Sequence, residues 1–157
     1  MENIVEEYFD QTDTDDLFVR PILFVGENRS NMAQEKDWSW ERCQLEKKPR
    51  NCANQLFDAL EYCGIDPYDI SKIHFINAFE DDLTEWVVNE DLHDIFRFYC
   101  ESGFAIVSLG NRVHRHLEEI DIPHIQLIHP AARGKIRKKE NYREHVRERL
   151  FEGLTHW

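Results

Sequence analysis

The sequence predicts an α/β protein in which helices cover both faces of a central parallel sheet of about four strands, giving three layers. Two observations carry this prediction. Four short apolar runs end at glycine, asparagine or histidine, a pattern typical of strands buried on both faces. The segments between the runs are long, and most repeat apolar residues at helical spacing, so each connection is expected to be a right-handed crossover between parallel strands.

The predicted strands are the runs 21–26, 72–77, 104–110 and 123–128. In an open parallel sheet the carboxyl ends of the strands lie along one edge, and ligands bind there. Polar or turn residues follow or end all four runs, at 26–28, 77, 110–111 and 129–130. We therefore expect a functional site along this edge.

Apolar residues at helical spacing predict four helices, over 53–60, 92–100, 111–120 and 141–152. Gly64 and Gly103 end the first two, and Asn111 is a suitable N-cap for the third. The stretch 27–51 is polar and irregular, so we expect a loop there. The stretch 78–90 is expected to be a loop or a partly helical connection.

The length of 157 residues fits a single domain, which we place at 21–157. The residues before it, 1–20, form an acidic N-terminal segment in which we expect a short helix and a loop. The net charge of −12 argues against a general nucleic-acid coat protein. The charge is uneven, however, because residues 129–157 hold eight Lys or Arg against four Glu. One edge of an acidic protein can therefore be basic.

The four cysteines form no C-x-x-C pair, and the chain has neither a signal-peptide pattern nor a long apolar span. We expect an intracellular, cytoplasmic protein in a reducing setting, monomeric and without a membrane partner. The sequence also lacks a dinucleotide-binding or P-loop glycine motif and any metal-ligand spacing. It therefore predicts no cofactor and no metal.

All four strand ends carry residues that resemble the uracil-DNA glycosylase superfamily, and at the third strand the run 106–111 resembles the family's strand-to-helix turn. In that family a Gly-x-[Asp/Asn/Ala]-Pro motif ends the first strand, an Asn ends the second and a His-Pro motif ends the fourth. Gly26-Glu27-Asn28, Asn77 and His129-Pro130 take these places in the same order. The sequence differs from the family's motifs at two places. Arg29 replaces the proline of the first motif. After the His-Pro motif, residues 131–133 are Ala-Ala-Arg where the best-known members have Ser-Pro-Leu.

The resemblance spans about residues 20–150 and implies a uracil-DNA glycosylase-like α/β domain. Its activity would be that of a monofunctional DNA N-glycosylase, which hydrolyses the N-glycosidic bond of uracil or another altered pyrimidine in base excision repair. The implied partner is single- or double-stranded DNA with the altered pyrimidine flipped out of the stack.

Cleavage of an N-glycosidic bond puts negative charge on the departing base and needs an oriented water. His129 is the candidate donor, and the family pattern implies that its neutral ring acts on the base O2. Asn28 is the candidate that orients the water through its amide oxygen, and Glu27 is the second acceptor. These three residues are the predicted catalytic set.

Asn77 offers an acceptor and two donors that match the O4 and N3–H edge of a pyrimidine. Trp40 or Trp38 could stack on an extruded base, although both could instead pack beneath the long loop. Basic residues near the same edge could contact DNA phosphates. These residues are Arg112, Arg115, Arg133, Lys135, Arg137, Lys138 and Lys139.

Two other functions stay open at this point. A catalytically silent relative that binds DNA or a protein is favoured by Arg29 and by the alanines at 131–132, because that loop loses its rigid prolines and its leucine. An enzyme that acts on free nucleosides or nucleotides could use the basic loop to bind a phosphate.

Overall fold

The computed structural model describes residues 20–81 and 91–157. The helix and loop expected within the N-terminal segment, and most of the connection expected at 78–90, lie outside the described residues.

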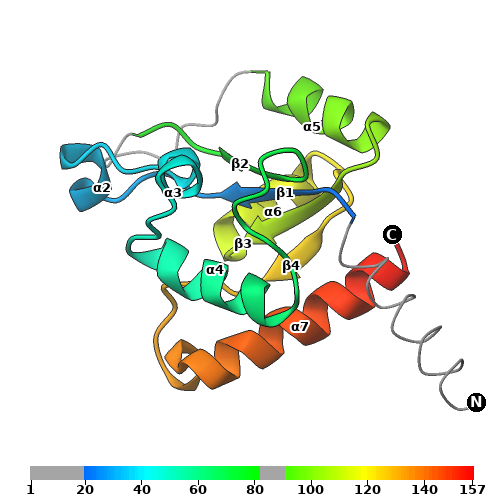
Figure 1. The fold of residues 1–157 in the computed structure, drawn as a ribbon. Coiled ribbons are helices and arrows are strands. Elements are labelled where there is room, and N and C mark those ends of the chain that lie inside the picture. Colours follow the sequence, from blue (N-terminus) through cyan, green and yellow to red (C-terminus); the bar gives the residue numbers. More distant parts are fainter. Residues whose placement is uncertain (1–19, 82–90) are drawn as a thin grey trace, which may run out of the picture.

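The central sheet is the one that the apolar runs predict. Its strands are β1 (Ile22–Gly26), β2 (Ile73–Asn77), β3 (Ala105–Leu109) and β4 (Ile125–Leu127). All are parallel, in the order β2-β1-β3-β4 (Figure 1). The sequence-based prediction of a four-stranded parallel sheet is therefore confirmed, with strand ends trimmed by one or two residues.

Both faces of the sheet are buried. Ile22 and Phe24 of β1 belong to one core cluster, Leu23 and Val25 belong to another, and all four side chains are fully buried. Such burial explains why the run is apolar throughout instead of alternating with polar residues.

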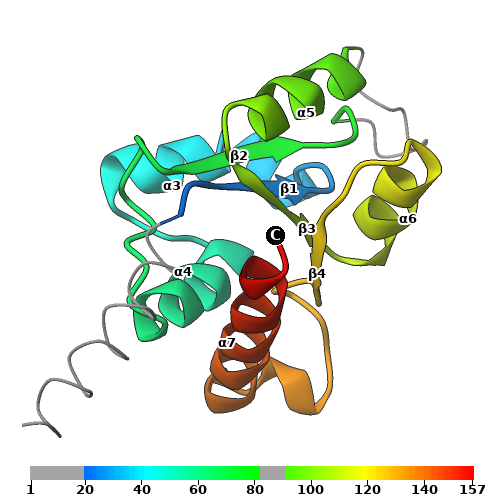
Figure 2. The same ribbon diagram turned by 90° about the vertical axis from the view of Figure 1, so that its right-hand side faces the viewer.

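Helices cover the two faces in pairs (Figure 2). The first cluster lies under α4 (Cys52–Tyr62) and α7 (Lys139–Thr155), and the second lies under α5 (Leu92–Glu101) and α6 (Asn111–Glu119). All four predicted helices are present, and α7 is longer than expected. Leu154 explains the extension at the C-terminal end, because it is buried and extends the inner stripe of α7 by one more turn.

Two expectations are wrong. Asn111 is the first residue of α6 and not its N-cap, a position that Gly110 takes with φ of 99°. The amide of Asn111 instead accepts a hydrogen bond from Gln126 at 3.1 Å. The stretch 27–51 is also not an irregular loop, because it contains α2 (Asn31–Glu35) and α3 (Trp40–Glu46).

Local capping explains these two short helices. The Ser30 hydroxyl accepts from the N–H of Ala33, and the Ser39 hydroxyl accepts from the N–H of Arg42. Each helix is too short and too polar to show an apolar period, so only the serine caps could have indicated it.

The four cysteines are free thiols. None of the helices in residues 20–81 and 91–157 is both long and apolar enough to cross a membrane.

Candidate active site

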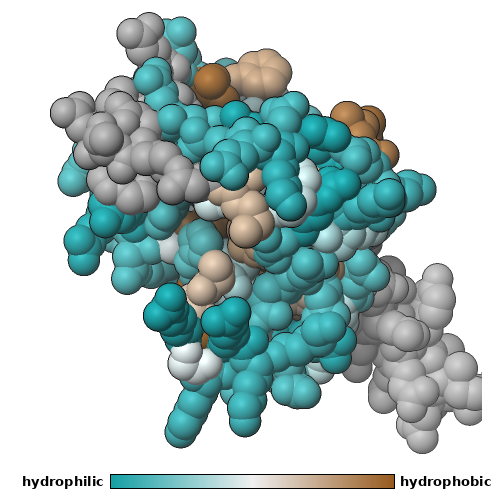
Figure 3. All heavy atoms as spheres, turned by 90° about the vertical axis from the view of Figure 1, so that its left-hand side faces the viewer, coloured by the Kyte–Doolittle hydropathy of each residue, from teal (hydrophilic) through white to brown (hydrophobic). Residues whose placement is uncertain are grey.

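A cavity of about 200 Å³ opens at the carboxyl edge of the sheet. Figure 3 views the molecule from this side, where the surface is mostly hydrophilic and a few less polar residues gather near the centre. The lining includes every residue predicted as catalytic or base-binding: Glu27, Asn28, Trp38, Trp40, Asn77 and His129. These six residues come from four separate parts of the chain, and the fold brings them around one space.

Gly26 allows two of these side chains to converge. It lies opposite Asn77 in the β1–β2 register. A Cβ atom on Gly26 would lie 2.8 Å from Asn77 Oδ1 and 3.0 Å from Trp40 Nε1. Any larger residue would therefore push the amide or the indole out of place.

Hydrogen bonds tie the loop after β1 to the segment after β2. Asn28 Nδ2 donates to the carbonyl of Glu80 at 3.2 Å, which fixes Oδ1 as the acceptor end of that amide. Arg29 donates to Asp81 twice, from its backbone N–H at 3.0 Å and from Nε at 2.7 Å. Arg29 thus holds the loop by hydrogen bonds where a proline would hold it by its ring.

The local geometry of His129 selects one tautomer. The N–H of Ala131 donates to His129 Nδ1 at 3.0 Å. Because a backbone N–H can only donate, the proton of the neutral ring is on Nε2. Burial lowers the pKa of His129 below its ordinary value, and the Glu27 carboxylate opposes this shift. The neutral ring with an Nε2–H donor is therefore the form that the site favours.

The helix α7 fixes the backbone that precedes this histidine. The Tyr142 hydroxyl donates to the carbonyl of Ile128 at 2.7 Å, and the N–H of Ile128 donates to His145 Nε2 at 3.0 Å. Sequence reasoning missed both residues. The only signal for Tyr142 was its place on the inner stripe of α7, which indicates packing and not a hydrogen bond.

The two tryptophans differ in their surroundings. Trp40 stacks on Phe75, with ring centroids 5.0 Å apart and planes 6° apart, so the core holds its ring in place. Trp38 lies beneath two cations, with Lys36 at 5.1 Å and Arg50 at 5.5 Å from the ring centroid. Packing therefore accounts for part of the Trp40 surface, although both rings still line the cavity.

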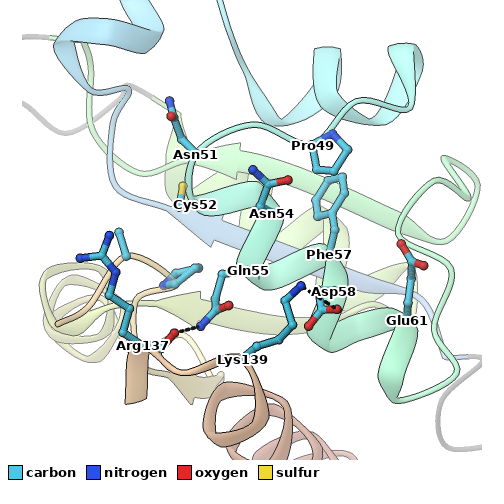
Figure 4. Close-up of a pocket in the computed structure, with 12 residues that line it drawn as sticks. Pro49, Asn51, Cys52, Asn54, Gln55, Phe57, Asp58, Glu61, Arg137 and Lys139 are labelled. Atoms are coloured by element: carbon cyan, nitrogen blue, oxygen red, sulfur yellow. Dashed lines mark hydrogen bonds and ion pairs between the residues drawn. The ribbon is translucent and has the colours of Figure 1, made fainter. Parts of the chain in front are cut away.

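A groove of about 610 Å³ adjoins the cavity. It lies between α4 and the segment that leads into α7, and Figure 4 shows residues of both elements along it. Gln55 donates to the carbonyl of Arg137 at 2.9 Å, and Lys139 lies 3.9 Å from Asp58. The cavity and the groove share Asn51, Cys52 and Ala131 in their walls.

The predicted phosphate-binding residues do not gather at one place. Arg137 and Lys139 line the groove. Among the residues that the structure describes, the other five predicted phosphate-binding residues line neither the groove nor the cavity. They are Arg112, Arg115, Arg133, Lys135 and Lys138. All five are exposed, the first two on α6 and the rest on or beside the short 3-10 helix Lys135–Arg137.

The cavity wall also contains residues that sequence reasoning missed, namely Arg50, Asn51 and Cys52. Burial raises the pKa of the Cys52 thiol to about 11, so it is protonated at neutral pH and is a poor nucleophile. Within the described ranges, no group of three or more His, Cys, Asp and Glu side chains could hold a metal ion.

Comparisons of the chain with protein-family models, with curated proteins and with solved structures find no match.

Proposed function

We propose that the chain has a uracil-DNA glycosylase-like fold and is a monofunctional DNA glycosylase that removes uracil or another altered pyrimidine. One observation carries the proposal: the cavity gathers a neutral histidine donor, two amides and a carboxylate at the carboxyl edge of a parallel sheet. The cavity of about 200 Å³ is smaller than the roughly 300–1,000 Å³ of sites for drug-sized ligands, which suits a single flipped ring.

The residues divide the reaction between them. Water adds to the sugar carbon while the bond from that carbon to the base breaks, and the bonding electron pair leaves with the base. His129 Nε2–H donates to the base oxygen where this charge develops. Asn28 Oδ1 orients the water, and Glu27 accepts a proton from it. Asn77 reads the edge of the pyrimidine.

The groove beside the cavity supports a path for the DNA strand on one side of the flipped nucleotide. It carries Arg137 and Lys139, and Asn54 and Gln55 of α4 offer amides along the opposite wall. Phosphate contacts of this kind position a nucleic acid without reading its sequence.

The test of this function is cleavage of oligonucleotides that each carry one modified base, followed by alkali to break the strand at any abasic site. We expect cleavage at uracil or at another altered pyrimidine, and none at the unmodified bases. If the parent protein binds DNA but cleaves no member of a broad panel, the protein is instead a catalytically silent relative that binds DNA. If free nucleotide inhibits cleavage and the protein releases the base from that nucleotide, the result favours an enzyme that acts on free nucleosides or nucleotides.

Salt should weaken DNA binding through the basic loop. When Lys135, Arg137, Lys138 and Lys139 are changed to Gln, we expect the log–log slope of affinity against salt to flatten. Each phosphate contact on duplex DNA contributes about 0.9 to that slope. Lys139 should contribute least, because it already lies near Asp58. The measurement is the dissociation constant over a salt series.

The control for this series changes Lys72, which precedes β2, and Arg97 on α5, both exposed and both distant in sequence from the basic loop. The slope change is compared per charge removed. If both sets of substitutions flatten the slope equally, the loop has no special part in DNA binding.

A further inference from the structure

Two histidines away from the proposed site face each other where α6 meets the segment that enters β4. His114 is on α6, and His124 is the residue before β4, on the segment that Figure 2 shows returning from α6 to the sheet. Neither residue lines the cavity at the carboxyl edge. His114 Nδ1 lies 2.8 Å from His124 Nε2, a hydrogen-bond distance. One of these two nitrogens must therefore carry a proton that the other accepts.

The outer nitrogen of each ring faces an oxygen that only accepts. His124 Nδ1 lies 2.7 Å from the carbonyl oxygen of Ile122, and His114 Nε2 pairs with the Glu118 carboxylate one turn along α6. A carbonyl and an ionised carboxylate have no proton to give, so both outer nitrogens are donors. A neutral imidazole has a single N–H, which these outer bonds already use. Two neutral rings would therefore turn lone pairs toward each other across the 2.8 Å contact.

We propose that His114 and His124 hold one additional proton between their facing nitrogens, and that this pair is a pH-sensitive link between α6 and β4. With the bridging proton in place, His114 carries two N–H groups, His124 stays neutral and every ring nitrogen of the pair is hydrogen-bonded. The Glu118 carboxylate balances the single positive charge. The inference goes beyond the proposed function and does not depend on it, because the link lies outside the cavity.

Acidification should open the link by adding a second proton. The facing nitrogens would then both be donors on two charged rings. Burial is the main cause that lowers the pKa of His124 below its ordinary value. The His114 ring lowers this pKa too, whereas the Ile122 carbonyl and Glu118 raise it. The unfolded chain therefore takes up this proton at a higher pH than the folded chain does, so stability falls as the pH drops through that interval.

Alkaline pH should open the link by removing the bridging proton. Either the facing nitrogens then lose their hydrogen bond, or His114 turns its remaining proton inward and leaves the Glu118 carboxylate without a donor. The link is therefore complete only between an acidic and an alkaline limit.

Titratable and charged groups of α7 and its C-cap face the pair across a cleft of about 430 Å³, which both histidines line. They are Arg149, Glu152 and His156. Arg149 and Glu152 have opposite charges, and Arg149 Nε donates to the carbonyl of Gln126 at 3.0 Å. His156 is the group of this set that titrates in the same range as the pair, so it supplies the control.

The first test is the protonation state of each ring, measured by nitrogen NMR of the histidine side chains in the full chain over a pH series. At neutral pH we expect protons on both nitrogens of His114 and on Nδ1 alone of His124. The second proton should reach His124 only below the pH at which the histidines of the urea-unfolded chain titrate. Two neutral rings at neutral pH overturn the proposal. A change in both rings when EDTA is added also overturns it, because a metal ion would then take the place of the proton.

The second test is a double-mutant cycle, which measures what the link contributes to stability. His114→Ala, His124→Ala and the double variant are unfolded in urea at several pH values. We expect a coupling of about tenfold in the unfolding equilibrium constant near neutral pH, since hydrogen bonds to charged groups are the stronger ones. The coupling should be lost at acidic and at alkaline pH.

His156→Ala is the matched control for this cycle, because it removes a histidine from the same cleft. Its coupling to His124 should be small at every pH. A coupling between His114 and His124 that does not change with pH, or one that His156 equals, contradicts the proposal. If a variant fails to fold, the NMR series on the parent protein decides the question alone.

Discussion

Replacing His129 with alanine should slow single-turnover removal of the base by roughly 10²–10³-fold, the loss typical of removing one donor to a developing oxyanion. The Nε2–H donor acts mainly in the transition state, so DNA affinity should change little. Rapid-quench assays with enzyme in excess measure the rate, and a filter or anisotropy assay measures the affinity. Equal rates for the variant and the parent would remove His129 from the reaction.

Two further variants make this result specific. His93→Ala changes an exposed histidine on α5 and should retain the parent rate. Asn28→Ala should be about as slow as His129→Ala. The double variant should lose less than the product of the two single losses, because both residues serve one step.

The pH dependence of the same rate tests the protonation state of His129. Burial lowers the pKa of this ring, and the Ala131 N–H already occupies Nδ1. The neutral ring is therefore present at neutral pH, and its loss should cause a fall in the rate as the pH drops through that lowered pKa. The part of the profile that is due to His129 should be absent from the profile of His129→Ala. A rate that rises on acidification through this range would show that the imidazolium is the active form.

Changes at Asn77 should have the second large effect, this time on the choice of base. Asn77→Asp replaces the amide donors by an acceptor, so we expect removal of uracil to fall by about 10²-fold or more and the preference to move toward cytosine-like edges. Asn77→Ala should lower cleavage without such a change of preference. The measurement is kcat/KM on paired oligonucleotides that differ in one base.

Asn54 offers a control for Asn77, because it lines the groove and not the cavity. Asn54→Asp introduces the same change of amide to carboxylate and should leave base preference unchanged. Unaltered preference in Asn77→Asp would exclude this residue from base reading.

The sheet could be predicted because burial on both faces leaves a plain trace in the sequence. The run before Gly26 is apolar at every position, and β1 is buried at every position. The cavity could be predicted in part for a related reason. In a parallel sheet the residue that follows each strand must lie at one edge, so Asn77 and His129 are brought to the same side by topology alone.

The rest of the cavity depends on contacts that sequence spacing does not encode. Arg50 reaches the wall in the turn between α4 and α3, and α3 forms where a loop was expected. The tautomer of His129 follows from one backbone hydrogen bond, and the position of Ile128 follows from side chains on α7. Each of these contacts requires the tertiary fold to be known first.

The two hydrogen bonds between α7 side chains and the backbone of Ile128 determine when, during synthesis of the chain, the cavity can take its final shape. Every residue that lines the cavity lies before position 132, whereas Tyr142 and His145 leave the ribosome later. A nascent chain that already carries Asn28, Asn77 and His129 still lacks the two hydrogen bonds that hold the strand end beneath the histidine. The cavity therefore acquires its final geometry only when α7 docks on α4 and the sheet, which makes synthesis through α7 a precondition of the base removal proposed above.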